Sequence, residues 1–276
     1  MLSYTCSMNT VQIVGILNTT PDSYFDGGQY NALSSALDRA KEMRAHGADI
    51  IEIGGQSTGP GSKDVSLDEE LSRTIPIIRV IKDSMPDSIL SIDTYVSDIA
   101  KEAIDAGVSM INDVTAGRGD SKLFAVVAKS DAKLVLMYAK DATARTTIET
   151  REYDDVIRTI HDFLLSRIEE AKKQGIEESD LIVDPGMGHF ISAEPAYSFE
   201  VIRRLQELTT LAPIFISPSR KSFLAGPSNL PPEDRLPATI AASIACVNNG
   251  ASYVRTHDVR ETNNALQIYA SIKRAQ

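Results

Sequence analysis

The chain has 276 residues, of which 42% are apolar and 24% are charged, and its formal net charge is -10 at pH 7. This composition is typical of a globular protein with a sizeable core, and the length allows one large domain or two small ones. The negative charge argues against a general binder of nucleic acid or of anionic membranes, because both kinds of binding depend on a positive surface field.

Two short apolar runs near the start of the chain each end in a polar, glycine-rich loop. Residues 11–18 precede Thr-Thr-Pro-Asp-Ser, and residues 50–54 precede Gly-Gln-Ser-Thr-Gly-Pro-Gly. The pattern predicts two strands, with a helix from about residue 33 to residue 46 between them that Gly47 ends. Loops of this kind are either long connections or ligand-binding loops.

The next helix is expected to begin near Ser66, which has the spacing of a capping box with Glu69. Pro76 lies inside the same helical pattern and predicts either a kink or a second helix start. Further apolar runs predict six more strands with helical patterns between them. These strands are expected at residues 89–93, 110–114, 133–137 and 181–184, at the start of 214–223 and at 252–257, and the clearest helices lie from about residue 156 to 175 and from about 261 to 273.

Eight apolar runs separated by helical patterns are the signature of parallel βαβ units. The runs are mostly apolar rather than alternating, as expected of strands that are buried on both faces. Eight such units in about 260 residues predict a (β/α)8 TIM barrel. We expect a single domain over residues 1–276, in which residues 1–10 form a short tail, and a doubly wound open sheet is the alternative fold.

The ligand site of such a barrel lies at the carboxyl ends of its strands. Carboxylates, an amide and a lysine there would suit a planar heterocycle with several donors and acceptors, and Asn, Arg and His would suit a phosphate. The alternatives are that Asp93 and Asp184 cap loops and that Arg220 and Lys221 are solvated surface cations. The residues at these strand ends are Asn18, Gly54, Gly55, Asp93, Asn112, Asp113, Met137, Asp184, Ser217, Lys221, Arg255 and His257.

Several common sites are missing from the sequence. It contains neither GxGxxG nor GxxxxGK[ST], the usual cradles for dinucleotides and nucleoside triphosphates, and no His, Cys or Glu cluster has zinc spacing. There is no apolar run of about 18 residues to span a bilayer, and the first ten residues lack a basic start and a hydrophobic middle. We therefore expect a soluble cytoplasmic protein.

Seven motifs in register give the chain a wider resemblance, from about Val11 to Ile272. Each motif alone is weak, and their shared order is specific. On these residues the chain resembles the dihydropteroate synthases of the pterin-binding family. The motifs are Asn18-Thr-Thr-Pro-Asp-Ser with Asp26-Gly-Gly, Gly54-Gly-Gln-Ser-Thr-Gly-Pro-Gly, Ser91-Ile-Asp-Thr-Tyr, Ile111-Asn-Asp-Val, Asp184-Pro-Gly-Met-Gly, Ser219-Arg-Lys-Ser-Phe and Gly250-Ala-Ser-Tyr-Val-Arg-Thr-His-Asp.

The resemblance implies a (β/α)8 barrel that joins 6-hydroxymethyl-7,8-dihydropterin pyrophosphate to p-aminobenzoate and releases pyrophosphate. Departure of pyrophosphate leaves a delocalised cation on the pterin methylene, and carboxylates would stabilise it. The implied catalytic residues are Asp93, Asp184, Lys221, Arg255 and His257. Of the substrate-binding residues, Asp93, Asn112, Asp184 and Lys221 would hold the pterin, and Asn18, Arg255 and His257 the pyrophosphate with Mg²⁺ at Asn18. Thr58, Pro60 and Ser222 would form the aminobenzoate site, with Met137 and Phe190 also lining the substrate pockets.

Three positions depart from the family pattern. Gly59 stands where the family usually has an arginine on the phosphate side, and Arg118 or Arg145 from another loop is a candidate substitute. Tyr138 replaces a histidine that often follows the methionine, and His189-Phe190-Ile191 replaces Phe-Gly-Lys. The segment around Phe190 is similar to the divergent, sulfonamide-insensitive branch, which predicts altered discrimination between aminobenzoate and sulfonamides.

Two other functions remain open from the sequence. One is a pterin-dependent methyltransferase that serves a corrinoid protein, although it would not need the Ser-Arg-Lys-Ser and Arg-x-His anion set. The other is a non-catalytic or altered-specificity pterin-binding homologue, which the loss of the arginine at Gly59 suggests. The family resemblance also implies a homodimer.

Overall fold

Eight parallel strands close into one barrel in the order of the sequence. The computed structural model describes residues 11–19, 29–57 and 59–275, and the side chains of 29–32 are not described. The closed barrel confirms the predicted fold and excludes the open sheet. The strands are β1 (Gln12–Asn18), β2 (Ile50–Gly54), β3 (Ile89–Asp93), β4 (Met110–Asp113), β5 (Lys133–Met137), β6 (Leu181–Asp184), β7 (Ile214–Ile216) and β8 (Ala251–Thr256).

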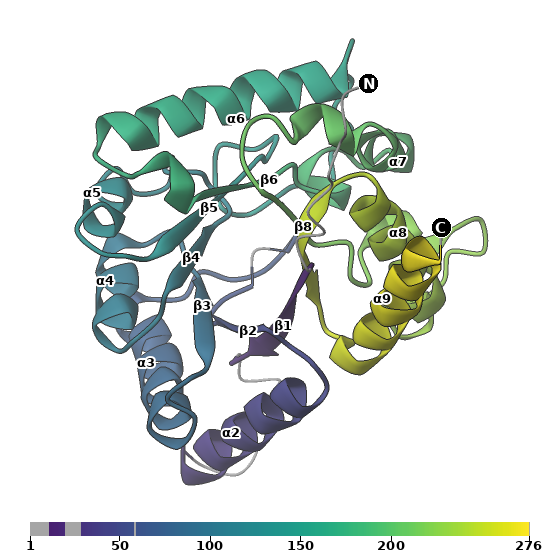
Figure 1. Ribbon diagram of the computed structural model, residues 1–276. Helices are drawn as coiled ribbons and strands as arrows, with labels where there is room; N and C mark the ends of the chain where they lie inside the picture. Colours follow the sequence, from purple (N-terminus) through teal and green to yellow (C-terminus); the bar gives the residue numbers. More distant parts are fainter. Residues whose placement is uncertain (1–10, 20–28, 58, 276) are drawn as a thin grey trace.

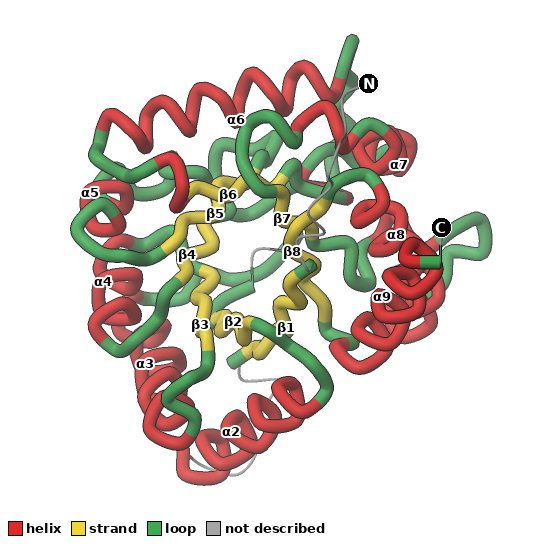
Figure 2. Tube along the Cα trace, in the orientation of Figure 1, coloured by secondary structure: helices red, strands yellow, loops and turns green. Residues whose placement is uncertain are grey.

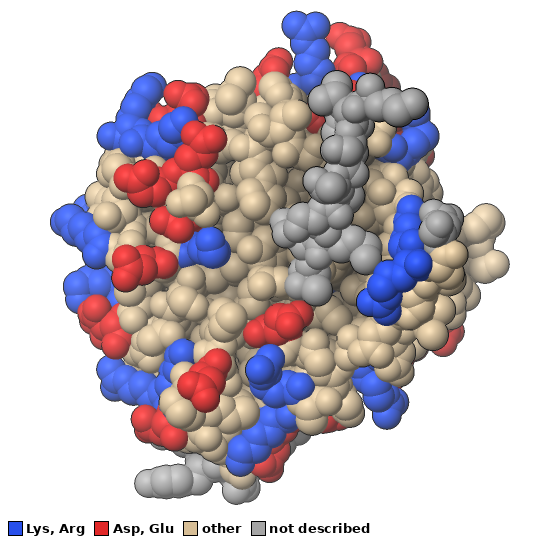
Figure 3. All heavy atoms as spheres, in the orientation of Figure 1, with Lys and Arg blue, Asp and Glu red and all other residues tan. Residues whose placement is uncertain are grey.

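A ring of helices surrounds the strands in Figures 1 and 2 and covers their outer face. None of the described helices is both long enough and apolar enough to cross a membrane. On the face drawn in Figure 3, positive and negative side chains are interspersed. The helices are α2 (Gln29–Ala45), α3 (Leu67–Ser84), α4 (Ser97–Asp105), α5 (Leu123–Val127), α6 (Val156–Lys173), α7 (Pro195–Arg203), α8 (Leu236–Asn248) and α9 (Val259–Arg274).

Helix α3 begins as predicted and continues through its proline. The Ser66 hydroxyl accepts a hydrogen bond from the backbone N–H of Glu69 at 3.2 Å, while the Glu69 carboxylate pairs with Arg73 instead of completing the capping box. The second helix start predicted at Pro76 is wrong, because α3 is one unbroken helix. Buried isoleucines on both sides of the proline hold the helix against the barrel and offset the lost backbone hydrogen bond.

Alternate residues of each strand point into the barrel. Inside, an apolar layer fills the lower part, and the polar residues at the strand ends lie two positions further along most of the same strands. The apolar layer consists of Val14, Ile50, Met110, Val135, Ile182 and Phe215, with Tyr253 packed against it. The barrel is therefore closed below by packed side chains, and the site stands on that floor.

The contact between β6 and β7 is the shortest pairing in the barrel. The two strands share the single register pair Val183 and Ile214, and the N–H of Val183 donates to the carbonyl of Pro213 at 3.0 Å. β7 itself has only three residues. We call this contact the β6/β7 seam.

Candidate functional site

Two steps along the strands from the apolar layer, the barrel interior becomes polar and charged. Glu52 follows Ile50, Asn112 follows Met110, and Asp184 follows Ile182 by this spacing. All three are buried, at 0%, 3% and 2% exposure. We call this level the polar layer, and its members are Glu52, Asp93, Asn112, Met137, Asp184, Ser217 and Arg255.

Arg255 is the centre of the polar layer. Its Nε pairs with Glu52 on β2, its Nη2 lies 2.9 Å from Asp93 Oδ2 on β3, and its Nη1 lies 3.5 Å from the Ser217 hydroxyl. Burial lowers the pKa of Arg255, but the two carboxylates outweigh burial and the pKa lies above its ordinary value. The guanidinium is thus permanently charged and ties three strands together.

Burial raises the pKa of Asp93 well above its usual range, and Glu52 raises it further while Arg255 opposes both. Glu52 also accepts hydrogen bonds at 3.2 Å from the Ser91 hydroxyl and from Asn112 Nδ2. Glu52 on β2 therefore joins side chains from β3, β4 and β8. The role of Glu52 is to hold Arg255 and Asn112 in place.

Asn112 presents an open acceptor. Its amide N–H donates to Glu52, which fixes the side chain, and its Oδ1 is buried without a hydrogen-bond partner among the described residues. An unsatisfied buried oxygen costs about 1 to 3 kcal/mol. A ligand with an N–H donor would recover that free energy.

Asp184 and Lys221 lie on opposite sides of the β6/β7 seam. Burial raises the pKa of Asp184 to about 6, which Lys221 and the N–H of Gly186 oppose; that N–H donates to Asp184 Oδ1 at 2.7 Å. Burial lowers the pKa of Lys221 to about 8, against the pull of Asp184. Lys221 Nζ also lies 5.0 Å from the centre of the Phe190 ring, so Phe190 reaches the same wall as the lysine.

His257 follows β8 and is neutral at pH 7. Burial and the nearby Arg255 lower the pKa of its imidazole to about 4. Its Nδ1 lies 3.0 Å from the Ser219 hydroxyl, which also accepts from the His257 backbone N–H at 3.2 Å. His257 can therefore serve as a hydrogen-bonding group for an anion but adds no charge.

Arg220, beside Lys221, is tied into the surrounding loops. It pairs with Asp258 and donates to the carbonyls of Pro232 and Glu233. Its backbone has a φ of 55°, a conformation that turns the chain sharply at this point. This contact set makes Arg220 structural, whereas Lys221 points into the site.

Asp113 and Met137 take different positions at their strand ends. Asp113 is fully buried and caps its own turn by accepting from the N–H and hydroxyl of Thr115, which is the loop-capping alternative considered for strand-end carboxylates. Met137 packs in an apolar cluster with Ala139 and Ala144, against which Phe190 lies. The cluster forms the apolar side of the site.

The residues assigned to the second substrate are only partly described. Ser222 is half-buried directly after Lys221, and Pro60 is exposed in the loop between β2 and α3. Thr58 lies outside the described residues, as does the loop that follows Asn18 from residue 20 to 28. The described part is compatible with an aminobenzoate site beside Lys221 and does not test it.

The predicted Mg²⁺ would depend on Asn18 at the exposed end of β1. Among residues 11–19, 29–57 and 59–275, no three His, Cys, Asp or Glu side chains lie close enough to hold a metal ion together. The Asn18 amide oxygen lies close to the end of β2, since a Cβ at Gly54 would be 3.7 Å from it. A single amide oxygen suits Mg²⁺, which usually keeps several waters and binds substrate phosphates.

The two arginines considered as substitutes at Gly59 differ in position. Arg118 lies over the Phe163 ring and donates to the carbonyls of Thr115 and Ala139. Arg145, by contrast, crosses to the loop between β2 and α3 and contacts residues 62–64 there. Of the two, Arg145 is the one that meets the loop in which the arginine is missing.

Comparison with known proteins shows to which family the chain belongs. Residues 14–257 match the family described as "Pterin binding enzyme". The chain belongs to the family of pterin-binding enzymes. The resemblance found in the motifs is thereby confirmed.

The individual relatives agree with that assignment. A dihydropteroate synthase from Synechocystis sp. is 39% identical over 249 residues, covering 90% of this chain and 85% of that protein. The structure of dihydropteroate synthase from Clostridium difficile, in the presence of pteroic acid, has a TM-score of 0.87 and 39% identity, and the match covers 99% of each chain. The Xanthomonas albilineans synthase with 4-aminobenzoic acid has a TM-score of 0.87 and 33% identity, covering 95% of this chain and 93% of that one.

Two contributors to the site were missed from the sequence. Glu52 interrupts the apolar run Ile-Ile-Glu-Ile and lies two residues from the inward-facing Ile50; a carboxylate inside a buried run was the available signal. Lys140 was the other, and its buried Nζ organises the loop after β5 through four hydrogen bonds. Nothing in the local pattern distinguished that lysine from a surface cation.

Proposed function

We propose that the chain is an active dihydropteroate synthase, joining 6-hydroxymethyl-7,8-dihydropterin pyrophosphate to p-aminobenzoate. The observation that supports it most directly is the combination of an open amide acceptor on Asn112 and the buried Asp184 in the polar layer with the half-buried Lys221 beside it. The family and the relatives with product-like and aminobenzoate ligands support the same activity.

The polar layer suits the pterin ring. The Asp184 carboxylate can accept two parallel hydrogen bonds from the amidine-like edge of the ring, Asn112 Oδ1 can accept a third, and Lys221 can donate to a ring acceptor. Burial strengthens each of these bonds because water does not compete. Recognition of the pterin by several fixed partners positions its methylene group at the mouth of the barrel.

The chemical step breaks the bond between the methylene carbon and the pyrophosphate oxygen and forms the bond from that carbon to the arylamine nitrogen, which then loses a proton. Asp93 and Asp184 place negative charge beside the pterin cation as pyrophosphate departs. His257 and Asn18 face the departing anion, and Mg²⁺, when bound at Asn18, would neutralise part of its charge. Three of the five N–H donors of Arg255 contact Glu52, Ser217 and Asp93, so two remain for the departing anion, which the charge of the guanidinium also attracts.

Incubation of the purified protein with both substrates and Mg²⁺ tests the proposal. Dihydropteroate and pyrophosphate should appear in equal amounts, and chelation of the metal with EDTA should slow the reaction strongly. Tight pterin binding without turnover would favour the non-catalytic homologue. Transfer of a methyl group from a methylated pterin to a corrinoid protein would favour the methyltransferase.

We propose in addition that the arylamine site discriminates against sulfonamides. The Phe190 ring lies against the apolar cluster that contains Met137 and next to Lys221, where it would narrow the space beside a bound pterin. Replacement of Phe190 by Ala should increase inhibition by sulfamethoxazole while the KM for p-aminobenzoate changes less. If sulfamethoxazole already inhibits the unmodified protein at concentrations that block an ordinary synthase, this discrimination is absent.

A homodimer and a cytoplasmic location complete the proposal. Phe199 on α7 is 50% exposed, and Ile268 and Ile272 on α9 are 64% and 60% exposed. Exposed apolar residues of this kind are available for an interface. Light scattering on the purified protein gives the oligomeric state directly, and fractionation of the source cells gives the location.

A further inference from the structure

The loop between β2 and α3, here called the second loop and described at residues 55–57 and 59–66, is held at its base by α3. Arg73 on α3 donates to the carbonyl of Gly55 at 3.1 Å. Further along, the Ser62 hydroxyl donates to the carbonyl of Gly59 at 2.8 Å, and the Ser62 N–H donates to the same carbonyl at 3.2 Å. Residues 59–62 thus form a small turn that carries Pro60.

That turn is also held from across the barrel by Arg145. Its Nε lies 3.1 Å from the Ser62 hydroxyl, its Nη2 lies 2.6 Å from the carbonyl of Lys63, and its Nη1 pairs with Asp64. All three guanidinium nitrogens therefore contact one three-residue segment, although it lies more than 80 residues away in the chain. Because the Ser62 hydroxyl passes the contact on to Gly59, Arg145 fixes the turn and not only the tip of the loop.

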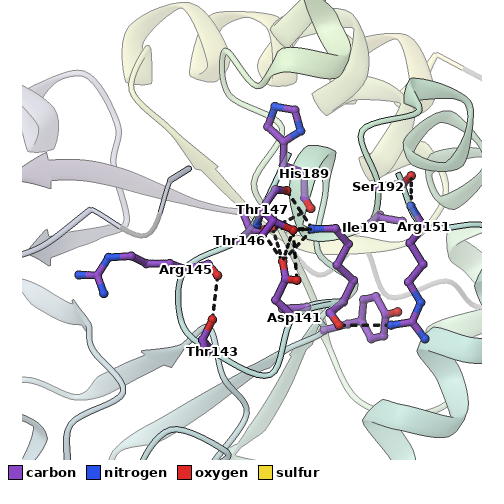
Figure 4. A network of polar contacts seen from close by, with 12 residues as sticks. Asp141, Thr143, Arg145, Thr146, Thr147, Arg151, His189, Ile191 and Ser192 are labelled. Carbon is purple, nitrogen blue, oxygen red and sulfur yellow. Dashed lines mark hydrogen bonds and ion pairs between the residues drawn. The ribbon is translucent and has the colours of Figure 1, made fainter. Parts of the chain in front are cut away.

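The segment that carries Arg145 is itself anchored. The Nζ of Lys140 is buried, with a side-chain exposure of 4%, and it lies 2.7 Å from Asp141 Oδ2 and 3.2 Å from the Thr146 hydroxyl. In Figure 4 this cluster is compact around Asp141, and the Arg145 side chain extends away from it. A guanidinium on such a base is positioned before any substrate arrives.

The anchor continues to the loop after β6, which carries Phe190. The Thr146 hydroxyl lies 2.8 Å from the carbonyl of His189, as Figure 4 shows, and the N–H of Lys140 donates to the carbonyl of Phe190 at 2.8 Å. The second loop is therefore coupled through Arg145 to the wall on which Lys221 and Phe190 meet.

Gly59 leaves the second loop without a large side chain at its turn. Among the described residues, a Cβ added there would lie 3.5 Å from the Ser57 hydroxyl, an ordinary van der Waals distance. Arg145 brings a cation to the turn from another loop. Each of its three nitrogens contacts the loop, which makes Arg145 a holder of the loop.

We propose that Arg145 is a positioning residue for the second substrate, because it holds the second loop in the place where that loop borders the aminobenzoate site. The kinetic effect expected from this role rests on the proposed synthase activity. The contact between Arg145 and the loop, however, can be tested without turnover.

Hydrogen exchange on the protein without substrates tests the contact itself. In Arg145→Ala, peptides that cover residues 59–64 should exchange roughly three- to tenfold faster than in the unmodified protein, since an exposed turn held by few bonds opens easily. Arg151→Ala is the matched control: Arg151 lies in the same segment and contacts Lys140 and Tyr153. Equal exchange in Arg145→Ala and the unmodified protein overturns the proposal, whether or not the protein makes dihydropteroate.

Steady-state kinetics test the consequence. Arg145→Ala should raise the KM for p-aminobenzoate about tenfold and leave the dissociation constant of the pterin pyrophosphate unchanged, and Arg145→Lys should recover part of the loss. Asp64→Ala should raise the same KM, and its effect should largely vanish in the Arg145→Ala background because the two residues act as one contact. A weaker affinity for the pterin pyrophosphate with an unchanged KM for p-aminobenzoate would make Arg145 an anion ligand and overturn the positioning role. If the unmodified protein forms no dihydropteroate, the synthase activity fails while the exchange result still decides the contact.

Discussion

Removal of Arg255 is the perturbation with the largest expected effect on the polar layer. Arg255→Met keeps most of the side-chain volume but leaves Glu52 and Asp93 as two buried carboxylates without their cation. Breaking a buried ion pair by removing one partner costs about 3 to 5 kcal/mol. For a chain of this size the loss should lower the melting temperature by about 10 °C.

The loss should depend on pH with a definite sign. Arg255 holds down the pKa of Asp93, which burial already raises, so without Arg255 the pKa of Asp93 in the folded state rises further above that in the unfolded chain. Groups of this kind contribute stability at low pH that is lost as pH rises through the folded pKa. The deficit of the variant should therefore be small near pH 5 and largest near pH 8.

Thermal melts followed by circular dichroism at these two pH values measure the deficit. Arg260→Met is the control, since Arg260 is exposed on α9 and, within the described part of the chain, pairs with its neighbour Glu261. A deficit that is the same at both pH values, or one below about 1 kcal/mol, would refute the view that Arg255 neutralises the polar layer.

Three further outcomes follow from the same geometry. Asp184→Asn should abolish pterin binding, measured by pterin fluorescence in a chain that has no tryptophan, while its circular dichroism is retained; unchanged affinity would remove Asp184 from the site. Pterin affinity in the unmodified protein should be greatest between about pH 6 and 8 and should fall about tenfold per pH unit below that range. The reason is that Asp184, with a pKa of about 6, binds a proton at the lower pH. An affinity that stays constant from pH 5 to 9 would contradict this role of Asp184. Gly186→Ala should weaken pterin binding and lower the melting temperature. Gly186 has a φ of 70°, and an added Cβ would lie 2.4 Å from the carbonyl oxygen of Tyr138. Full activity with an unchanged melting curve would show that the turn at Gly186 can move to accommodate the Cβ.

The strands were predictable because each buried run is short, apolar and ended by glycine, proline or a polar residue. The strand-end residues Asn112, Asp184 and Lys221 followed from the same endings, since parallel strands of a barrel bring their carboxyl ends together. Their partners were harder to identify. The sequence does not indicate that Arg255 is divided between Glu52 and Asp93, because that pairing depends on three strands meeting in space.

Loops were the least predictable part. The segment from residue 141 to 152 reads as a polar connection. Its order arises from Lys140, whose partners lie within the segment, and from Arg145, whose partners lie on another loop. Arg145 was recognisable only as one of two candidates to replace the arginine absent at Gly59. Local propensity carries no information on contacts between loops that are more than 80 residues apart.

Because the β6/β7 seam is so short, a ligand bound there also stabilises the barrel. The barrel is joined there by one register pair, and the facing charges of Asp184 and Lys221 lie just above it. A pterin that bonds both residues acts as an additional rung between the two strands and completes the circumference of the barrel at its thinnest point. Binding of the substrate then also makes the barrel more rigid, so slower amide exchange in β6 and β7 would report the fraction of sites that are occupied.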